Sequence, residues 1–250
     1  MFLGLTLISI RKIIKYLFSK GWMSYKLSPS SLSLMKECPR CFWLEQNKIW
    51  KRPSGIFPSL PSGMDRILKK HFDSFRDKGV LPPELVNAFD EVEASNFNLF
   101  GESDEEKDLL EVWRDSRKGL RYQDSEGNIL AGAVDNLLVR NGKLIVLDYK
   151  TRGYDLKKDT HEHYQDQLDV YSLLLERNGY DLEGYAFLLF YIPERVLESG
   201  EFIFDTKLIK MPLSPENAED LFRKALEILN GECPEKRKCE WCSGFTWDES

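Results

Sequence analysis

The chain has 250 residues, of which 42% are hydrophobic and 30% charged, with a formal net charge of -6. This composition excludes an intrinsically disordered chain and suffices for one substantial hydrophobic core. The net charge does not favour nucleic-acid binding, but catalytic acids contribute to it, and basic residues cluster locally, as at Arg66, Lys69 and Lys70.

The first 22 residues differ from the rest of the chain. An apolar run over 1–10 precedes a basic amphipathic stretch over 11–20. A signal peptide has the opposite order, and the apolar run is too short to span a bilayer. We therefore expect an N-terminal extension over 1–22, a single domain over 23–250 and no stable membrane span.

Helices are expected in the first half of the chain. The N-cap signal Ser28-Pro29 predicts a helix that continues to about Asn47. A proline-rich loop over 53–61 separates it from a helix over 63–76. Residues 83–122 are expected to form a mainly helical insertion.

Strands dominate the next part. Two apolar runs predict strands over 128–140 and 143–149, and Asn141-Gly142 between them predicts a tight hairpin turn. A helix over 162–178 should end at Asn178-Gly179. Strands over 184–192 and 201–211 and a helix over 216–229 complete the pattern. This order predicts an α/β fold with a mixed central sheet flanked by helices.

Two acids and a lysine stand out on the hairpin. Asp135 follows Gly132-Ala133-Val134, and Asp148 follows the apolar run over 144–147. Side chains alternate along a strand, so Asp148 and Lys150 should share a face. A buried carboxylate needs a partner, and two carboxylates beside a lysine suit Mg²⁺ or Mn²⁺. The alternative is that both acids are solvated ends of the hairpin.

These residues resemble the RecB-like branch of the PD-(D/E)XK nuclease superfamily. Its members carry an Asp, then Asp-x-Lys on the next strand, then Gln-x-x-x-Tyr on a helix, which here are Asp135, Asp148 with Lys150, and Gln167 with Tyr171. An upstream helix with a metal-binding His corresponds to the segment from Gly63 to His71. The resemblance implies a restriction-endonuclease-like core.

The resemblance also implies roles for these residues. His71, Asp135, Asp148 and the backbone carbonyl of Tyr149 would bind the metal ion. Lys150 would orient the attacking water and stabilise charge on the phosphate. Gln167 and Tyr171 would position the DNA strand, although as a lone pair they would most often be packing residues.

The implied activity is that of a cytoplasmic, Mg²⁺- or Mn²⁺-dependent deoxyribonuclease, which hydrolyses phosphodiester bonds as a single-strand exonuclease. It would process DNA ends in repair, recombination or CRISPR adaptation, with a helicase or a CRISPR-adaptation protein as its partner. The alternative is a weakly active or inactive nuclease-fold module that binds DNA or a partner.

The five cysteines fall into two groups at opposite ends of the chain. Cys38 and Cys41 form one C-x-x-C pair, Cys239 and Cys242 form another, and Cys233 lies in the same cysteine-rich tail, 231–250. Such pairs hold metals, so we expect a tether between the tail and the first helix. The ligand sets left open are Cys38, Cys41, Cys239 and Cys242, which we favour, or Cys38, Cys233, Cys239 and Cys242.

The cysteine pattern is compatible with more than one metal centre. Related nucleases bind a [4Fe–4S] cluster with one early and three late cysteines, but the late spacing differs here. A structural Zn²⁺ accepts the same four thiolates, and free buried cysteines are the remaining alternative. Sulfur separations of ~3.5–4 Å would indicate zinc, and roughly 6 Å or more would indicate the cluster.

Overall fold

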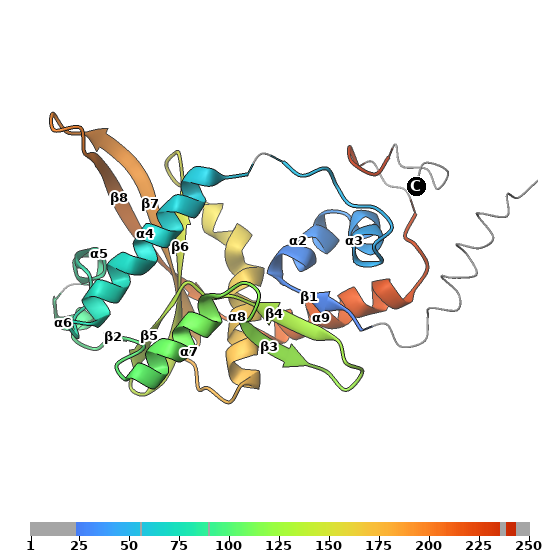
Figure 1. The fold of residues 1–250 in the computed structure, drawn as a ribbon, viewed down its shortest axis with the longest axis horizontal. Coiled ribbons are helices and arrows are strands. Elements are labelled where there is room, and N and C mark those ends of the chain that lie inside the picture. The colour runs from blue at the N-terminus through green and yellow to red at the C-terminus, as the bar shows by residue number, and fades with distance from the viewer. Residues whose placement is uncertain (1–23, 56, 90, 236–238, 244–250) are drawn as a thin grey trace, which may run out of the picture.

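The computed structural model describes residues 24–55, 57–89, 91–235 and 239–243. Its main sheet has five strands in the order β2-β5-β6-β7-β8 (Figure 1). These are β2 (Asn98–Leu99), β5 (Asn136–Arg140), β6 (Lys143–Thr151), β7 (Tyr185–Val196) and β8 (Phe202–Pro212). The antiparallel strands β5 and β6 are joined at Asn141 and Gly142, which have φ angles of 53° and 77°. These positive angles confirm the expected tight turn.

A helical crossover connects β6 to β7. Strand β7 is parallel to β6, so the chain must return across the sheet before β7 begins. It does so through the short helix η1 (Thr160–Tyr164) and helix α8 (Gln165–Arg177). Strand β8 then returns antiparallel to β7, and the two extend past the body of the sheet as a hairpin (Figure 1).

A second sheet lies beside the first. Its order is β1-β4-β3, formed by β1 (Lys26–Leu27), β4 (Ile129–Gly132) and β3 (Leu120–Gln123). The single strand expected over 128–140 is therefore divided between the two sheets, because the chain leaves β4 at Gly132 and enters β5 at Asn136. Gly132 allows close packing here, since an added Cβ would lie 2.8 Å from Cε1 of Tyr171.

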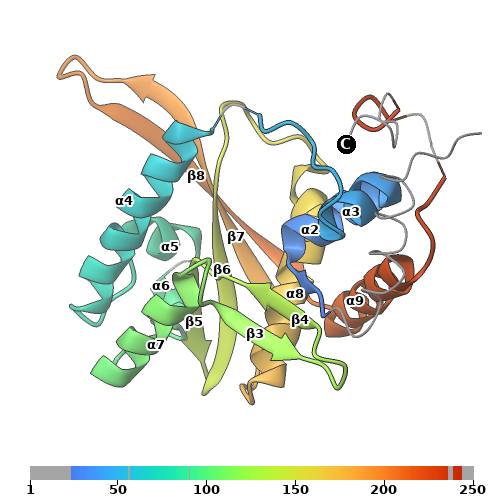
Figure 2. The ribbon, with the colours of Figure 1, turned by 45° about the vertical axis from the view of Figure 1, so that its right-hand side comes forward.

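Helices cover both faces of the main sheet (Figure 2). One face packs against α4 (Ser59–Arg76), α5 (Pro83–Ala88) and α6 (Glu91–Ala94), through β6 residues Ile145, Leu147 and Tyr149. The opposite face, with Leu144 and Val146, belongs to the larger core. That core also includes residues of α8 and of α2 (Pro29–Glu37), α3 (Pro39–Gln46), α7 (Asp104–Arg114) and α9 (Pro215–Asn230). Alternation along β6 thus places Asp148 and Lys150 on the α8 side.

Two expected elements differ in detail. The helix expected over 28–47 divides at Cys38, which ends α2 and caps α3 with its side chain, while Pro39 starts α3. The insertion over 83–122 contains α5, α6 and α7 but also strand β2 and most of β3. Strand β2 pairs with β5, so sheet formation overrides the helical pattern at that point.

The segment after α9 returns to the N-terminal helices. Trp43 Nε1 donates a hydrogen bond of 3.3 Å to the carbonyl of Gly231, and Arg40 Nη1 donates one of 2.9 Å to the carbonyl of Pro234. The tail therefore packs on α3, as the cysteine spacing predicts. No helix of the described residues is long and apolar enough to cross a membrane. The extension expected over 1–22 lies outside the described residues.

Candidate active site

Asp135 and Asp148 lie at the junction of the two sheets. Asp135 stands just before β5, and Asp148 stands in β6 with 1% of its surface exposed. Oδ2 of Asp135 accepts a 3.0 Å hydrogen bond from the backbone N–H of Tyr149, the residue after Asp148. The hairpin therefore brings both acids to one place, as the sequence predicts.

Lys150 is the cation of the site. Its Nζ lies 2.5 Å from Oδ2 of Asp148 and donates a 3.0 Å hydrogen bond to Oε1 of Gln167. The ammonium also lies 4.6 Å from the ring centre of Tyr164. Lys150 is therefore held by β6, η1 and α8 together, and it shares a face of β6 with Asp148 as expected.

Gln167 and Tyr171 complete the α8 side of the site. They are four residues apart and so share one face of the helix. Nε2 of Gln167 donates a 2.6 Å hydrogen bond to the Tyr171 hydroxyl and lies 3.4 Å from Oδ1 of Asp148. Each end of the Gln167 amide thus contacts a group of the site.

Burial disfavours the negatively charged form of the Asp148 carboxyl. Desolvation raises the pKa of this carboxyl to about 7, the negative charge of Asp135 adds to the rise, and Lys150 opposes it. Among the described residues, its buried Oδ2 has the ion pair with Lys150 but no hydrogen bond. Two carboxylates with such an oxygen are a donor set that suits a hard divalent cation.

Helix α4 supplies a further pair that the motif comparison missed. Nζ of Lys69 lies 3.0 Å from Oδ2 of Asp65 and 3.3 Å from Oδ1 of Asp135. The ammonium therefore stands between two carboxylates, where a metal cation would also be favoured. The signal in the sequence was the spacing of four between Asp65 and Lys69, which puts both side chains on one helix face.

His71 lies elsewhere on the same helix. Its Nε2 is 3.0 Å from Oε1 of Glu84, which accepts a 2.6 Å hydrogen bond from the Tyr191 hydroxyl. Among the described residues, His71, Asp135 and Asp148 do not form a group within reach of one ion. Residues two positions apart on a helix are rotated by about 200° around its axis, so the side chains of Lys69 and His71 face different directions. The role of His71 as a ligand stays a prediction.

Buried polar contacts hold Asp135 in place. Arg114 Nε donates a 2.8 Å hydrogen bond to the backbone carbonyl of Asp135, and its Nη1 contacts Asp73 at 2.9 Å. Arg76 also pairs with Asp73 and donates a 2.6 Å hydrogen bond to Asn136, the residue after Asp135. These contacts tie the acid to α4 and α7.

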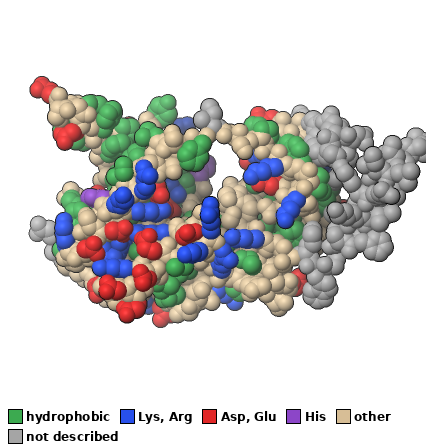
Figure 3. Space-filling view, in the orientation of Figure 1, with side chains coloured by type: hydrophobic (Ala, Val, Ile, Leu, Met, Phe, Trp, Pro, Cys, Tyr) green, Lys and Arg blue, Asp and Glu red, His purple; other side chains and the backbone are tan. Residues whose placement is uncertain are grey.

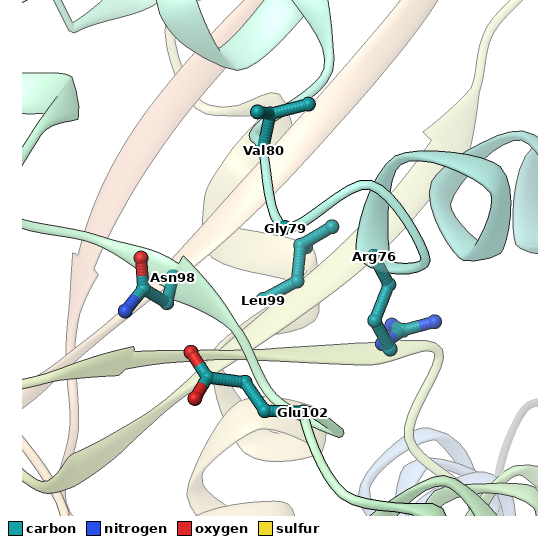
Figure 4. A pocket seen from close by; sticks show the side chains of 6 residues that line it. All are labelled: Arg76, Gly79, Val80, Asn98, Leu99 and Glu102. Atoms are coloured by element: carbon teal, nitrogen blue, oxygen red, sulfur yellow. The ribbon is translucent and has the colours of Figure 1, made fainter.

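A small pocket lies beside this network. Figure 4 shows that the guanidinium of Arg76 points away from the Glu102 carboxylate. The residues that line the pocket are Arg76, Gly79, Val80, Asn98, Leu99 and Glu102. The pocket includes neither acid of the junction and is therefore separate from the candidate active site.

The cysteines form a second centre. Sγ of Cys38 lies 3.7 Å from Sγ of Cys242, and Sγ of Cys41 lies 3.6 Å from Sγ of Cys239. All four sulfurs lie within 4.8 Å of one another. Cys233 is outside this group, with its Sγ 3.4 Å from Nη1 of Arg40. The favoured four cysteines therefore converge, and four thiols at this spacing could bind a metal.

The chain matches a family model over most of its length. The family model of the PD-(D/E)XK nuclease superfamily matches residues 26–244. The crystal structure of SSO0001 is similar over 90% of this chain and 88% of that chain, with a TM-score of 0.39 and 13% sequence identity. No curated protein matches this chain. The family match covers both the acid site and the cysteine cluster.

Proposed function

Since the chain belongs to the PD-(D/E)XK nuclease superfamily, we propose that it is a Mg²⁺- or Mn²⁺-dependent deoxyribonuclease with its active site at Asp135, Asp148 and Lys150. The observation that carries this proposal is the convergence of two acids and a lysine. The backbone N–H of Tyr149 contacts Asp135, and Lys150 pairs with the buried Asp148. Solvated hairpin ends would not be buried in this way.

The metal ion would be held by carboxylate oxygens of Asp135 and Asp148 and by the backbone carbonyl of Tyr149. Such an ion lowers the pKa of bound water and offsets negative charge on the phosphate. The third side chain would come from α4. Asp65, linked to Asp135 through Lys69, is better placed than His71, which would first have to leave Glu84.

Lys150 would orient the attacking water and stabilise charge that develops on the phosphate oxygens. Gln167 fixes the position of this ammonium at 3.0 Å and is itself tied to Tyr171. The attack forms a new P–O bond and breaks the ester bond to the leaving sugar oxygen. Gln167 and Tyr171 would therefore act by positioning Lys150 and the strand.

Two exposed aromatic side chains support a single-stranded substrate. Tyr154 is 84% exposed in the loop after β6, and Phe57 is 70% exposed in the loop before α4. These loops lie side by side in both ribbon views (Figures 1 and 2). Exposed aromatic rings stack on unpaired bases, so we propose exonuclease action on single strands during DNA end processing.

Basic side chains that could contact DNA phosphates lie on one face of the molecule. Figure 3 shows Lys and Arg side chains over α4 and beside the turn after α7, mixed with acidic side chains. Local positive charge of this kind can contact phosphates even on a chain with a net charge of -6.

The test is cleavage of labelled DNA by the full chain with Mg²⁺ or Mn²⁺. Linear single strands should be shortened from an end, and circular single strands should survive. Lys150→Ala should abolish cleavage but keep Mn²⁺ binding, and Asp148→Ala should lose both. Lys143→Ala, at the exposed start of the same strand, is the matched control and should cleave normally.

Two results would contradict the proposal. Cleavage by Lys150→Ala at the rate of the unaltered chain would remove the lysine from the mechanism. DNA binding without any cleavage, in either metal, would favour the inactive binding module instead.

A further inference from the structure

The four-cysteine cluster has dimensions that distinguish between metal centres. Sγ of Cys38 and Sγ of Cys242 are 3.7 Å apart, Sγ of Cys41 and Sγ of Cys239 are 3.6 Å apart, and no pair of the four sulfurs is further apart than 4.8 Å. A disulfide is excluded in this structure, because bonded sulfurs lie about 2.05 Å apart. The sulfurs thus surround a common centre without being joined to one another.

A tetrahedral zinc site has this size. With Zn–S bonds of about 2.3 Å, the edges of the sulfur tetrahedron measure about 3.8 Å. A [4Fe–4S] cluster binds each thiolate to a different iron of a larger body, which holds the sulfurs roughly 6 Å or more apart. We propose that Cys38, Cys41, Cys239 and Cys242 bind a single Zn²⁺ and not an iron–sulfur cluster.

The surroundings of the sulfurs suit a closed structural site. Cys38, Cys41 and Cys242 are buried, and Cys239 is partly buried, which leaves no open position for a substrate. The backbone N–H of Cys41 lies 3.5 Å from Sγ of Cys38 and can donate a hydrogen bond to it. Four thiolates around Zn²⁺ leave a net charge of -2, which makes nearby donors and cations favourable.

Two arginines supply positive charge at this site. Nη2 of Arg52 lies 3.9 Å from Sγ of Cys239. Nη1 of Arg40 lies 3.4 Å from Sγ of Cys233, the cysteine outside the cluster. The Nε atoms of both arginines are buried and, among the described residues, lack a hydrogen-bond partner. Arg52 is already paired with Glu37 at 2.7 Å, and the thiolates of a zinc centre would add to the compensation of positive charge on both arginines.

The ion would join the two ends of the domain. Cys41 lies on α3, and Cys239 lies in the tail after α9, 198 residues later. Helix α2 in turn contacts α8 through Lys36 and Asp166, whose charged atoms are 2.5 Å apart. Zinc would thus stabilise the helical layer behind Gln167 and Tyr171. This inference is independent of the nuclease activity.

The test is the metal content of the full chain purified without oxygen and without chelators. We expect about one zinc per chain, little iron, and no visible absorption of an iron–sulfur chromophore. Offering zinc together with iron and sulfide to the metal-free chain should give the zinc form. Four irons with acid-labile sulfide per chain, or no bound metal at all, would overturn the proposal.

Single cysteine variants identify the ligands. Cys239→Ala should reduce bound zinc by about tenfold or more and lower the melting temperature, because zinc binding is coupled to folding. Cys233→Ala is the matched control and should keep the zinc of the unaltered chain. Loss of zinc in Cys233→Ala would show that the ligand set is wrong.

A second measurement covers variants that fail to fold. In the native unaltered chain, a thiol reagent should modify Cys233 first, and the other four thiols should react only as zinc is released to a coloured chelator. If all five thiols react at one rate without zinc release, the site does not exist.

Discussion

The stability of Asp148→Asn relative to the unaltered chain should rise with pH when no Mg²⁺ or Mn²⁺ is present. The carboxyl of Asp148 is buried beside Asp135, and its pKa rises from the usual 3.8 to about 7. Because the folded pKa is raised, the folded chain keeps a proton that the unfolded chain releases. Stability is therefore lost as pH rises from about 4 to about 7, and the neutral asparagine escapes this loss.

The magnitude follows from the difference between the two pKa values. About 3 powers of ten in the ionisation constant correspond to about 4 kcal/mol of unfolding free energy over the whole range. Between about pH 5.5 and pH 8, where the thiolate site should stay intact, about 2 kcal/mol of this is accessible. We therefore expect the stability of Asp148→Asn relative to the unaltered chain to grow by about 2 kcal/mol over that interval.

Urea denaturation, followed by tryptophan fluorescence, measures this difference at each pH. The buffers contain no added Mg²⁺ or Mn²⁺ and no chelator, because a chelator would also remove zinc from the cysteines. Asp155→Asn, which neutralises a side chain that is 88% exposed, is the control and should give a difference that does not change with pH. Adding Mn²⁺ should stabilise the unaltered chain only. A difference for Asp148→Asn that is constant or shrinks with rising pH would refute the reasoning.

Three further changes test other parts of the site. Gly132→Ala should cost about 1–3 kcal/mol in urea denaturation and slow cleavage, because the new Cβ would lie 2.8 Å from the Tyr171 ring; unchanged stability would contradict this packing. Asp65→Ala should weaken Mn²⁺ binding, measured by calorimetry, more than His71→Ala does, since Asp65 is linked to Asp135; the reverse order would assign the ligand to the histidine. Tyr154→Ala should lower affinity for single-stranded DNA by about 5- to 150-fold, equivalent to about 1–3 kcal/mol of base stacking, and equal binding in a fluorescence titration would remove Tyr154 from the DNA path.

Much of the acid site followed from patterns of short range. Alternation along a strand put Asp148 and Lys150 on one face, and a spacing of four put Gln167 and Tyr171 on one face of a helix. The turn at 141–142 followed from its two residues in the same way. Such features depend on backbone geometry within a few residues, so the sequence by itself determines them.

Other features depended on contacts between distant segments. The rotation of α4 about its own axis directs Lys69 toward Asp135 and His71 toward Glu84. This rotation is set by the packing of α4 on the sheet, and a helical sequence pattern alone does not determine it. The division of 129–140 between two sheets occurs where Gly132 packs closely against Tyr171, which lies 39 residues later in the chain.

The cysteines show the same contrast between local and distant information. Their C-x-x-C spacing indicated a metal site, but five residues offered more than one set of four ligands. Only the return of the tail onto α3 brings Cys239 and Cys242 to Cys38 and Cys41 and leaves Cys233 beside Arg40. The physical reason is that spacing along the chain limits which thiols can share an ion, whereas packing decides their separations in space and hence which metal fits between them.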